Sequence, residues 1–484
     1  MRTTPRWALP LIFLAFAMAI LRIGLLVGHT PLLALANSFD QARYSGCFDL
    51  YPDRPDFIRP DTNSPDAPFS FYAFRKNPVP LCYLSTDLAL QSVVAAGFRA
   101  DQAWTGAERF DVRWLGWLRL LSLLGICALF CRAWWKRGVW GAAVGNALAF
   151  ALVLADPANT VYFSTFYAEA TALFSLFVLL NLVVLWQDDT ANARKILALA
   201  LVAMALSVSK IQHLALPLAL AGVILIHGRL ARARWPWQGF ALLAGAVLGC
   251  LVQFAQLGRD DPMMVSIRSY NRADVVFTAL LPHVEDPAAT LARLGLPEHC
   301  VAYIGKSAWQ LPGIAEDICP GIGKIGRGAI VAELLRQPAA AMRLAGSGFG
   351  ALHPWVAPNL GLVEGEILGT LPPAFFTLSR PLEDLPLLRY VLFVLPLLIA
   401  PFAFRRRDRL ATFTLLVATL GPATLGVILL GDGLADVPKQ GHLIFNADLL
   451  WCVVALPALM MARRKATSVD ALRGRYVLDS STGA

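Results

Sequence analysis

The sequence is short of charged residues. Asp, Glu, Lys and Arg make up 15% of its 484 residues, whereas soluble domains carry about 25%. Hydrophobic residues make up 57% of the chain, and the mean hydropathy is +0.57. This composition excludes an ordinary soluble globular protein and indicates an all-α protein that crosses a membrane several times.

Several motifs of soluble enzymes are also missing. The chain has no CxxC pair, no HExxH motif and no Gly-rich phosphate loop between a strand and a helix. It has no internal repeat, no low-complexity tract and no soluble domain on the side where we expect the cytoplasm. Dithiol redox chemistry, HExxH-type proteolysis and P-loop nucleotide hydrolysis are therefore not indicated.

Apolar runs of membrane-spanning length are the main positive feature, since a transmembrane helix needs about 20 such residues. The segment 196–228 is too long for one span and basic at both flanks. We interpret it as a hairpin of two short spans with Lys210 at its tip. The ten expected spans are 7–27, 114–131, 139–155, 170–186, 196–209, 214–228, 240–257, 387–404, 410–430 and 447–461.

Basic residues set the expected orientation, because Lys and Arg beside short loops mark the cytoplasmic side. Six clusters beside the spans hold 17 basic residues and three acidic ones, so both termini are expected in the cytoplasm. The net charge of +9 is then a topology signal and does not indicate a nucleic-acid partner. The clusters are Arg2 and Arg6; Arg132, Lys136 and Arg137; Arg194 and Lys195; Arg229, Arg232 and Arg234; Arg405, Arg406, Arg407 and Arg409; Arg463, Arg464 and Lys465.

The spans divide the chain into four parts. The first apolar run is longer than a usual signal-peptide core, so we expect it to remain as a span. The parts are an N-terminal membrane module at 1–257 with an outer loop at 28–113, a large outer loop at 258–386, the last spans at 387–465, and a cytoplasmic tail at 466–484 that we expect to be disordered.

The two long outer loops differ in pattern. In the second, segments 286–296 and 329–352 have apolar residues at helical spacing, which predicts short amphipathic helices on the membrane surface, the latter kinked or split at Pro338. The first is Pro- and Asp-rich at 51–69, which argues against regular structure in this loop and for an ordered cover pinned by a disulfide.

Half of the eight cysteines fall in these outer loops. Cys47 and Cys82 share the first loop, and Cys300 and Cys319 share the second. Two cysteines per loop in an oxidising compartment predict the disulfides Cys47–Cys82 and Cys300–Cys319, with four free thiols as the alternative.

Ionisable groups recur where the outer loops meet the membrane. Such groups are costly at that depth, so each is a functional candidate. Carboxylates act as general bases and cations neutralise phosphates. Each also has a plain structural reading, as a solvated acid, a helix cap, a snorkelling cation or a hydrogen-bonding histidine. The candidates are Asp40, Glu169, Lys210, His213, Lys439, His442 and Asp448.

Aromatic and arginine residues near the span ends are less specific. Tyr162 and Tyr167 suit stacking on a sugar and equally suit an interface belt. Arg22, Arg113 and Arg119 are expected to snorkel toward the headgroups.

Five stretches carry a family resemblance: "NSFD", "YFSTFYAEATALF", "SKIQH", "YNRADVVFTALLP" with "DPAATLARLGLP", and "DVPKQGHLIFNADLL". With them the chain resembles glycosyltransferases of the GT-C superfamily, and more narrowly the hexose transferases of bacterial glycan biosynthesis (WsfD type). The resemblance covers most of the chain. It implies a helical protein of the bacterial inner membrane with its active site on the non-cytoplasmic face.

The resemblance also implies a substrate class and residue roles. The donor is a sugar on polyprenyl phosphate or diphosphate, and the acceptor is a glycan or a lipid-linked molecule. The essential acid of the first outer loop corresponds to Asp40, and the basic residue at the donor phosphate to Lys210 or Lys439. The first loop lacks a paired-carboxylate metal motif, so no cofactor is expected, and a divalent metal is left open. We therefore assign Asp40 as general base, Glu169 to orient the acceptor or support the base, Lys210 and His213 to the donor phosphate, and Lys439 and His442 to assist them.

Two alternatives stay open. A glycan polymerase or ligase would use the same lipid carriers and arginines in its outer loops. A transporter or lipid-sugar flippase would show paired repeats and polar sites at mid-membrane, neither of which is clear here. The arginines of the second outer loop are Arg259, Arg268, Arg272 and Arg327.

Overall fold

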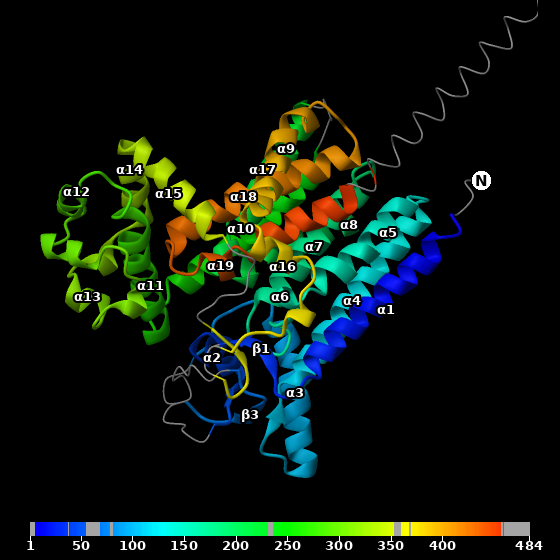
Figure 1. Cartoon of the computed structure of the whole chain (residues 1–484), viewed down its shortest axis with the longest axis horizontal. Helices are drawn as coiled ribbons and strands as arrows, with labels where there is room; N and C mark the ends of the chain where they lie inside the picture. Colours follow the sequence, from blue (N-terminus) through cyan, green and yellow to red (C-terminus); the bar gives the residue numbers. More distant parts are fainter. Residues whose placement is uncertain are drawn as a thin grey trace, which may run out of the picture.

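The computed structural model shows an all-α membrane protein with several spans and two extramembrane lobes (Figure 1). It describes residues 5–36, 38–54, 68–77, 81–230, 236–352, 360–366, 369–455 and 458. The predicted tail 466–484, most of the Pro-rich stretch 51–69 and the end of the last predicted span lie outside the described residues.

Six helices of the described chain are long and apolar enough to cross a membrane. Shorter apolar helices lie among them, so that a helix occupies every predicted span, while the count of ten remains a prediction. The six are α1 (Ala8–Val27), α4 (Arg113–Lys136), the segment Ile211–Leu230 that contains α9 (Leu216–Leu230), α10 (Trp237–Leu257), α17 (Pro386–Ala403) and α18 (Arg409–Gly431). The shorter ones are α5 (Trp140–Ala149) with its continuation Phe150–Leu154, α7 (Glu169–Leu185), α8 (Ala193–Ser209) and His442–Ala455.

The predicted hairpin breaks at Lys210. Helix α8 ends at Ser209, and Lys210 has extended backbone angles (φ −159°, ψ 151°) before the chain turns into α9. Both halves pack against α10. The α8–α10 contact is close, because a Cβ at Gly245 would collide with the backbone of Ala200. The break therefore holds a charged residue within the bundle.

Basic residues gather at one end of this bundle. Asp189 accepts ion pairs from Arg137 (2.7 Å) and Lys195 (2.9 Å), which belong to different predicted clusters. Arg409 of a third cluster pairs with the neighbouring Asp188 at 2.9 Å. Three of the predicted basic clusters thus meet, as a common membrane side for them requires.

The first lobe is formed by the part of the chain that follows α1 and precedes α4. Its small strands form an antiparallel sheet in the order β2–β3–β4, while β1 pairs with β5 from the second long loop. The expectation that this loop lacks regular structure was wrong for residues 88–105, which form a helix of 18 residues. Its elements are β1 (Leu33–Ala36), α2 (Ser38–Ser45), β2 (Leu50–Pro52), β3 (Phe71–Phe74), α3 (Leu88–Thr105), β4 (Phe110–Asp111) and the partner strand β5 (Gly361–Val363).

The second lobe consists of short helices at the left of Figure 1. Pro338 separates α14 from α15, as its position predicted, and the disulfide Cys300–Cys319 closes the lobe. Its helices are α11 (Pro262–Asp274), α12 (Pro287–Leu294), α13 (Ala315–Ile318), α14 (Arg327–Arg336) and α15 (Pro338–Ala351). The remaining short helices are α6 (Pro157–Thr160), α16 (Ser379–Asp384) and α19 (Val437–Gln440).

Candidate functional site

Two charged residues from opposite ends of the chain meet beside the first lobe. Lys439 Nζ lies 3.0 Å from Asp40 Oδ2 and 2.5 Å from Asp436 Oδ2. Asp40 also accepts hydrogen bonds from the Tyr167 hydroxyl (3.1 Å) and the Arg43 guanidinium. One carboxylate therefore joins α2, the loop before α7 and α19.

A second ion pair lies at the start of α7. Lys210 Nζ is 2.5 Å from Glu169 Oε1, with side-chain exposures of 8% and 1%. Glu169 is in the first turn of its helix, where the helix dipole favours a carboxylate. The break after α8 brings Lys210 to this carboxylate, so both unusual positions in the sequence are explained by one contact.

The two ion pairs form one cluster. Lys439 lies 5.6 Å from the centre of the Tyr167 ring, and the rings of His213 and His442 are 5.9 Å apart. His442 Nδ1 lies 3.1 Å from the carbonyl of Lys439. The predicted candidates of four separate loops thus come together at the end of the bundle away from the basic clusters.

Burial and charge act against each other at Asp40. Burial by itself would raise the pKa of its carboxyl, but the charges of Arg43, Lys439 and Lys210 outweigh it and hold the pKa well below the usual range. At Lys439 burial would lower the pKa, but Asp40 and Asp436 hold it well above the usual value. Both groups are therefore charged at neutral pH, and Lys210 lies within electrostatic reach of Asp40.

A buried arginine shapes the loop before Glu169. Arg119 has no exposed surface and pairs with the equally buried Asp87. Its guanidinium donates to the carbonyls of Tyr162 (2.6 Å), Phe163 (2.8 Å), Thr165 (2.5 Å) and Tyr167 (2.9 Å). The expectation that this arginine snorkels was wrong. Inside the protein, the Asp87 carboxylate neutralises its charge and four turn carbonyls accept its hydrogen bonds.

Two further arginines also bind within the protein. Arg22 donates to the carbonyls of Ala151 (3.1 Å) and Phe375 (2.9 Å). Arg113 pairs with Asp111 and donates to the carbonyl of His29 at 2.9 Å. These bonds, rather than lipid headgroups, occupy the two guanidinium groups.

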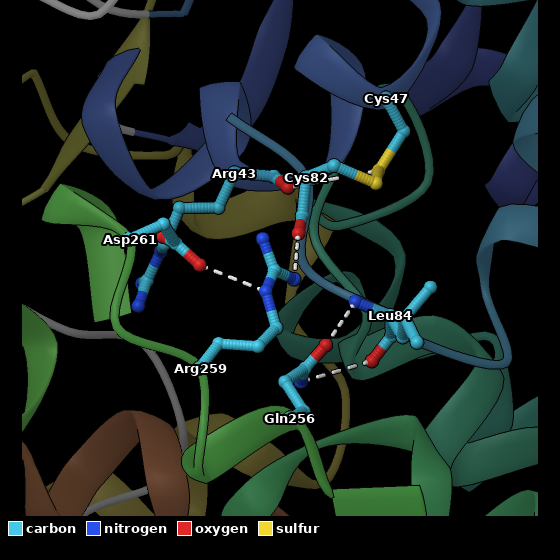
Figure 2. The surroundings of a disulfide bond; sticks show 7 residues. All are labelled: Arg43, Cys47, Cys82, Leu84, Gln256, Arg259 and Asp261. Atoms are coloured by element: carbon cyan, nitrogen blue, oxygen red, sulfur yellow. Dashed lines mark hydrogen bonds and ion pairs between the residues drawn. A yellow bond between two sulfur atoms is a disulfide. The ribbon is translucent and has the colours of Figure 1, made fainter. Parts of the chain in front are cut away.

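Helix α2, which carries Asp40, is tied to the membrane bundle. The disulfide Cys47–Cys82 joins the short turn after α2 to the segment before α3 (Figure 2). Arg259 donates to the carbonyl of Cys82 at 2.8 Å, and Gln256 bonds to the backbone of Leu84. The end of α10 thereby holds the disulfide-linked segment against the bundle.

Acids of the last outer loop were missed in the sequence. Asp436 lies three residues, or about one helical turn, before Lys439, and this spacing favours an ion pair. Burial raises its pKa to about 6 despite the charge of Lys439. Nearby, burial and the proximity of Asp432 raise the pKa of Asp274 to about 9. Burial also raises the pKa of Asp432.

A cavity of about 680 Å³ adjoins this acidic loop. Asp436, Pro438 and Leu434 line one side, while the second lobe supplies the other. A larger cavity of about 1010 Å³ lies at the basic end, where Trp134 and Arg409 are among its lining residues. The smaller cavity is therefore the one that touches the charged cluster, through Asp436.

The remaining candidates are buried. Tyr162 and Tyr167 are each 1% exposed. The sugar-stacking role predicted for them stays a prediction. Asp448 is buried within His442–Ala455. Among the described residues, no group of three or more His, Cys, Asp or Glu side chains is arranged to hold a metal ion.

A family model covers most of the chain. The model of the YfdI N-terminal transmembrane domain matches residues 72–471. The chain belongs to this family. No curated protein and no solved structure matches it. The matched family region contains Glu169, Lys210 and Lys439, while Asp40 precedes it.

Proposed function

We propose that the protein is a membrane glycosyltransferase. It moves a sugar from a polyprenyl-phosphate or polyprenyl-diphosphate donor to a glycan or lipid-linked acceptor. The reaction takes place at the outer face of a bacterial inner membrane, with ten spans and both termini in the cytoplasm. The observation that carries the proposal is the convergence of Asp40, Glu169, Lys210 and Lys439 at the end of the bundle away from the basic clusters.

The chemistry of the cluster fits transfer from a lipid phosphate. Breaking the bond between the sugar and the phosphate leaves negative charge on the phosphate oxygen. Lys210 and Lys439 are the cations that would stabilise that charge, because fixed cations in a buried site do so strongly. Asp40 and Glu169 hold the two ammonium groups in place before the donor arrives.

The same contacts bear on the alternatives. A transporter site is expected near the middle of the membrane, whereas these charges gather at the helix ends. A polymerase or ligase needs arginines that face a substrate. Arg259 instead binds the carbonyl of Cys82 and Asp261, and Arg327 donates to the carbonyl of Gly431 at 2.7 Å. The contacts of these two arginines favour the transferase.

The test is an assay of the purified protein in nanodiscs with a panel of polyprenyl-phosphate hexoses. We expect release of polyprenyl phosphate and loss of that release in Lys439→Met. Lys324→Met, which removes an exposed lysine of the second lobe, serves as the matched control and should retain full activity. Absence of sugar release or transfer by the wild-type protein with every donor would overturn the proposal.

A further inference from the structure

The cavity beside Asp436 has the size and the lining residues that suit a saccharide. Its volume of about 680 Å³ falls within the range of small-molecule pockets, roughly 300–1,000 Å³. Trp309 lines it with 51% of its surface exposed, and the exposed Gln310 adds a polar side chain. An exposed indole beside hydrogen-bonding groups suits the apolar face and the hydroxyls of a sugar.

The walls of this cavity are fixed by hydrogen bonds. The amide of Ala308, next to Trp309, donates to Asp274 at 2.7 Å. His283 Nε2 lies 2.8 Å from the Ser347 hydroxyl. Trp309 therefore belongs to a turn that a hydrogen bond to Asp274 fixes in place, and the pocket is formed before any ligand binds.

The loop with Asp436 is pressed against the same lobe. Leu434 donates its amide to the Thr278 hydroxyl at 2.8 Å. Gly433 has a φ of +65°, and a Cβ there would collide with Thr278 and with the backbone of Asp274. Only glycine permits this approach, which places the loop with Asp436 at the cavity wall.

We propose that this cavity is the acceptor subsite, that it takes a saccharide against the Trp309 indole, and that Asp436 is the general base for the attacking hydroxyl. The inference rests on the proposed function and names the substrate class and base of that site. The acceptor oxygen forms a bond to the anomeric carbon, and the bond from that carbon to the phosphate oxygen breaks. The phosphate leaves with the electron pair, and the hydroxyl proton passes to Asp436.

The surroundings of the two candidate acids support this assignment. Asp40 accepts bonds from Arg43, Tyr167 and Lys439. Asp436 has its ion pair to Lys439 through Oδ2 and lines the cavity. Its pKa of about 6 leaves it ionised at neutral pH and close to the value that serves a base there.

The experiment measures two reactions of the protein in nanodiscs with polyprenyl-phosphate hexoses. One is release of the sugar to water, which reports the donor site. The other is transfer to methyl glycosides of glucose, mannose, galactose and rhamnose, supplied at high concentration. Trp309→Ala should raise the acceptor KM at least about tenfold and leave release to water unchanged. Asp436→Asn should lower kcat for both reactions about 100-fold or more.

Matched controls come from the exposed surface. Trp104, 93% exposed, and Asp260, whose side chain is 92% exposed, lie away from the cavity, so Trp104→Ala and Asp260→Asn should match the wild type. Release to water without transfer to any glycoside, or an unchanged KM in Trp309→Ala, would overturn the acceptor subsite and leave the proposed function standing. Full kcat in Asp436→Asn, with kcat lost in Asp40→Asn, would return the base role to Asp40. A wild-type protein that neither releases nor transfers sugar would overturn the proposed function itself.

Discussion

Removing Lys210 alone should destabilise the protein through the carboxylate left behind. Glu169 is 1% exposed, and its Oε2 has no hydrogen-bond partner among the described residues, so Lys210 is its close cation. Deleting one partner of a buried ion pair costs about 3–5 kcal/mol. We therefore expect Lys210→Met to lose several kcal/mol of unfolding free energy at pH 7.

Protonation sets an upper limit on that loss. A carboxyl with an ordinary pKa of about 4.3 can be neutralised at pH 7 for about 3.7 kcal/mol, and at pH 5 for about 1 kcal/mol. The part of the Lys210→Met deficit that comes from the unpaired charge should therefore not exceed about 4 kcal/mol at pH 7. It should shrink as the pH falls, because the unpaired carboxyl then takes up a proton at lower cost.

A second substitution separates stability from chemistry. In Glu169→Gln/Lys210→Met no charge is left unpaired at this contact, so most of the lost stability should return, while sugar transfer should stay absent. Arg380→Met provides the matched control. Its ion pair with Asp384 spans 3.1 Å, with side chains 47% and 55% exposed, and such surface pairs contribute about 0–1 kcal/mol.

The measurement is denaturant unfolding in detergent micelles at pH 7 and pH 5, beside the transfer assay. Three results would refute the reasoning about the Glu169–Lys210 pair. They are a Lys210→Met deficit no larger than that of Arg380→Met, a deficit that does not change with pH, and a double variant no more stable than the single one.

Four further outcomes test the rest of the site. Asp40→Asn should cost about 2–3 kcal/mol at pH 7, and because the folded pKa of Asp40 is lowered, unfolding curves should show the wild-type advantage disappearing as the pH falls below about 4. If Asp436, which faces Lys439, Asp432 and Lys210, is the base, kcat/KM should rise with pH through about 6 in the wild type, and a pH profile of Asp436→Asn should lack this limb. Arg119→Lys should lose most activity and about 3–5 kcal/mol of unfolding free energy, since an ammonium cannot bind four carbonyls and a carboxylate together. Cys47→Ala/Cys82→Ala should lower transfer more than Cys300→Ala/Cys319→Ala in parallel assays, because the first bridge holds the segment with Asp40 and the second lies in the outer lobe.

The helical framework was predictable because hydrophobicity and length act locally. Apolar runs and basic flanks mark where a chain crosses a membrane, and each predicted run is a helix in the structure. The interruption of the helix at Lys210 was also predictable from the sequence, because a cation between two short apolar runs is costly within the membrane. Helix α3 was missed because the Pro- and Asp-rich stretch before it dominated the interpretation of the loop.

The partners of the charged residues were not predictable from one sequence. Asp87 lies among the many acids of the first loop, and nothing local marks it as the partner of Arg119. Ion pairs between residues distant in the chain depend on how the helices pack. The i,i+3 spacing of Asp436 and Lys439 was a local signal that the sequence did contain, but the choice of Asp436 over Asp432 needed the cavity.

The position of Lys439 gives the cluster a way to couple its two sides. One ammonium contacts Asp40 on the side of the first lobe and Asp436 on the side of the cavity. Two carboxylates share one ammonium group. The carboxylate whose negative charge is less neutralised by nearby cations is easier to protonate, and this is Asp436. A donor phosphate that draws Lys439 toward itself reduces the compensation of Asp436 further, which raises the basicity of Asp436 when an acceptor hydroxyl must be deprotonated. Binding of the donor would in this way prepare the base, a coupling that a single ion pair does not provide.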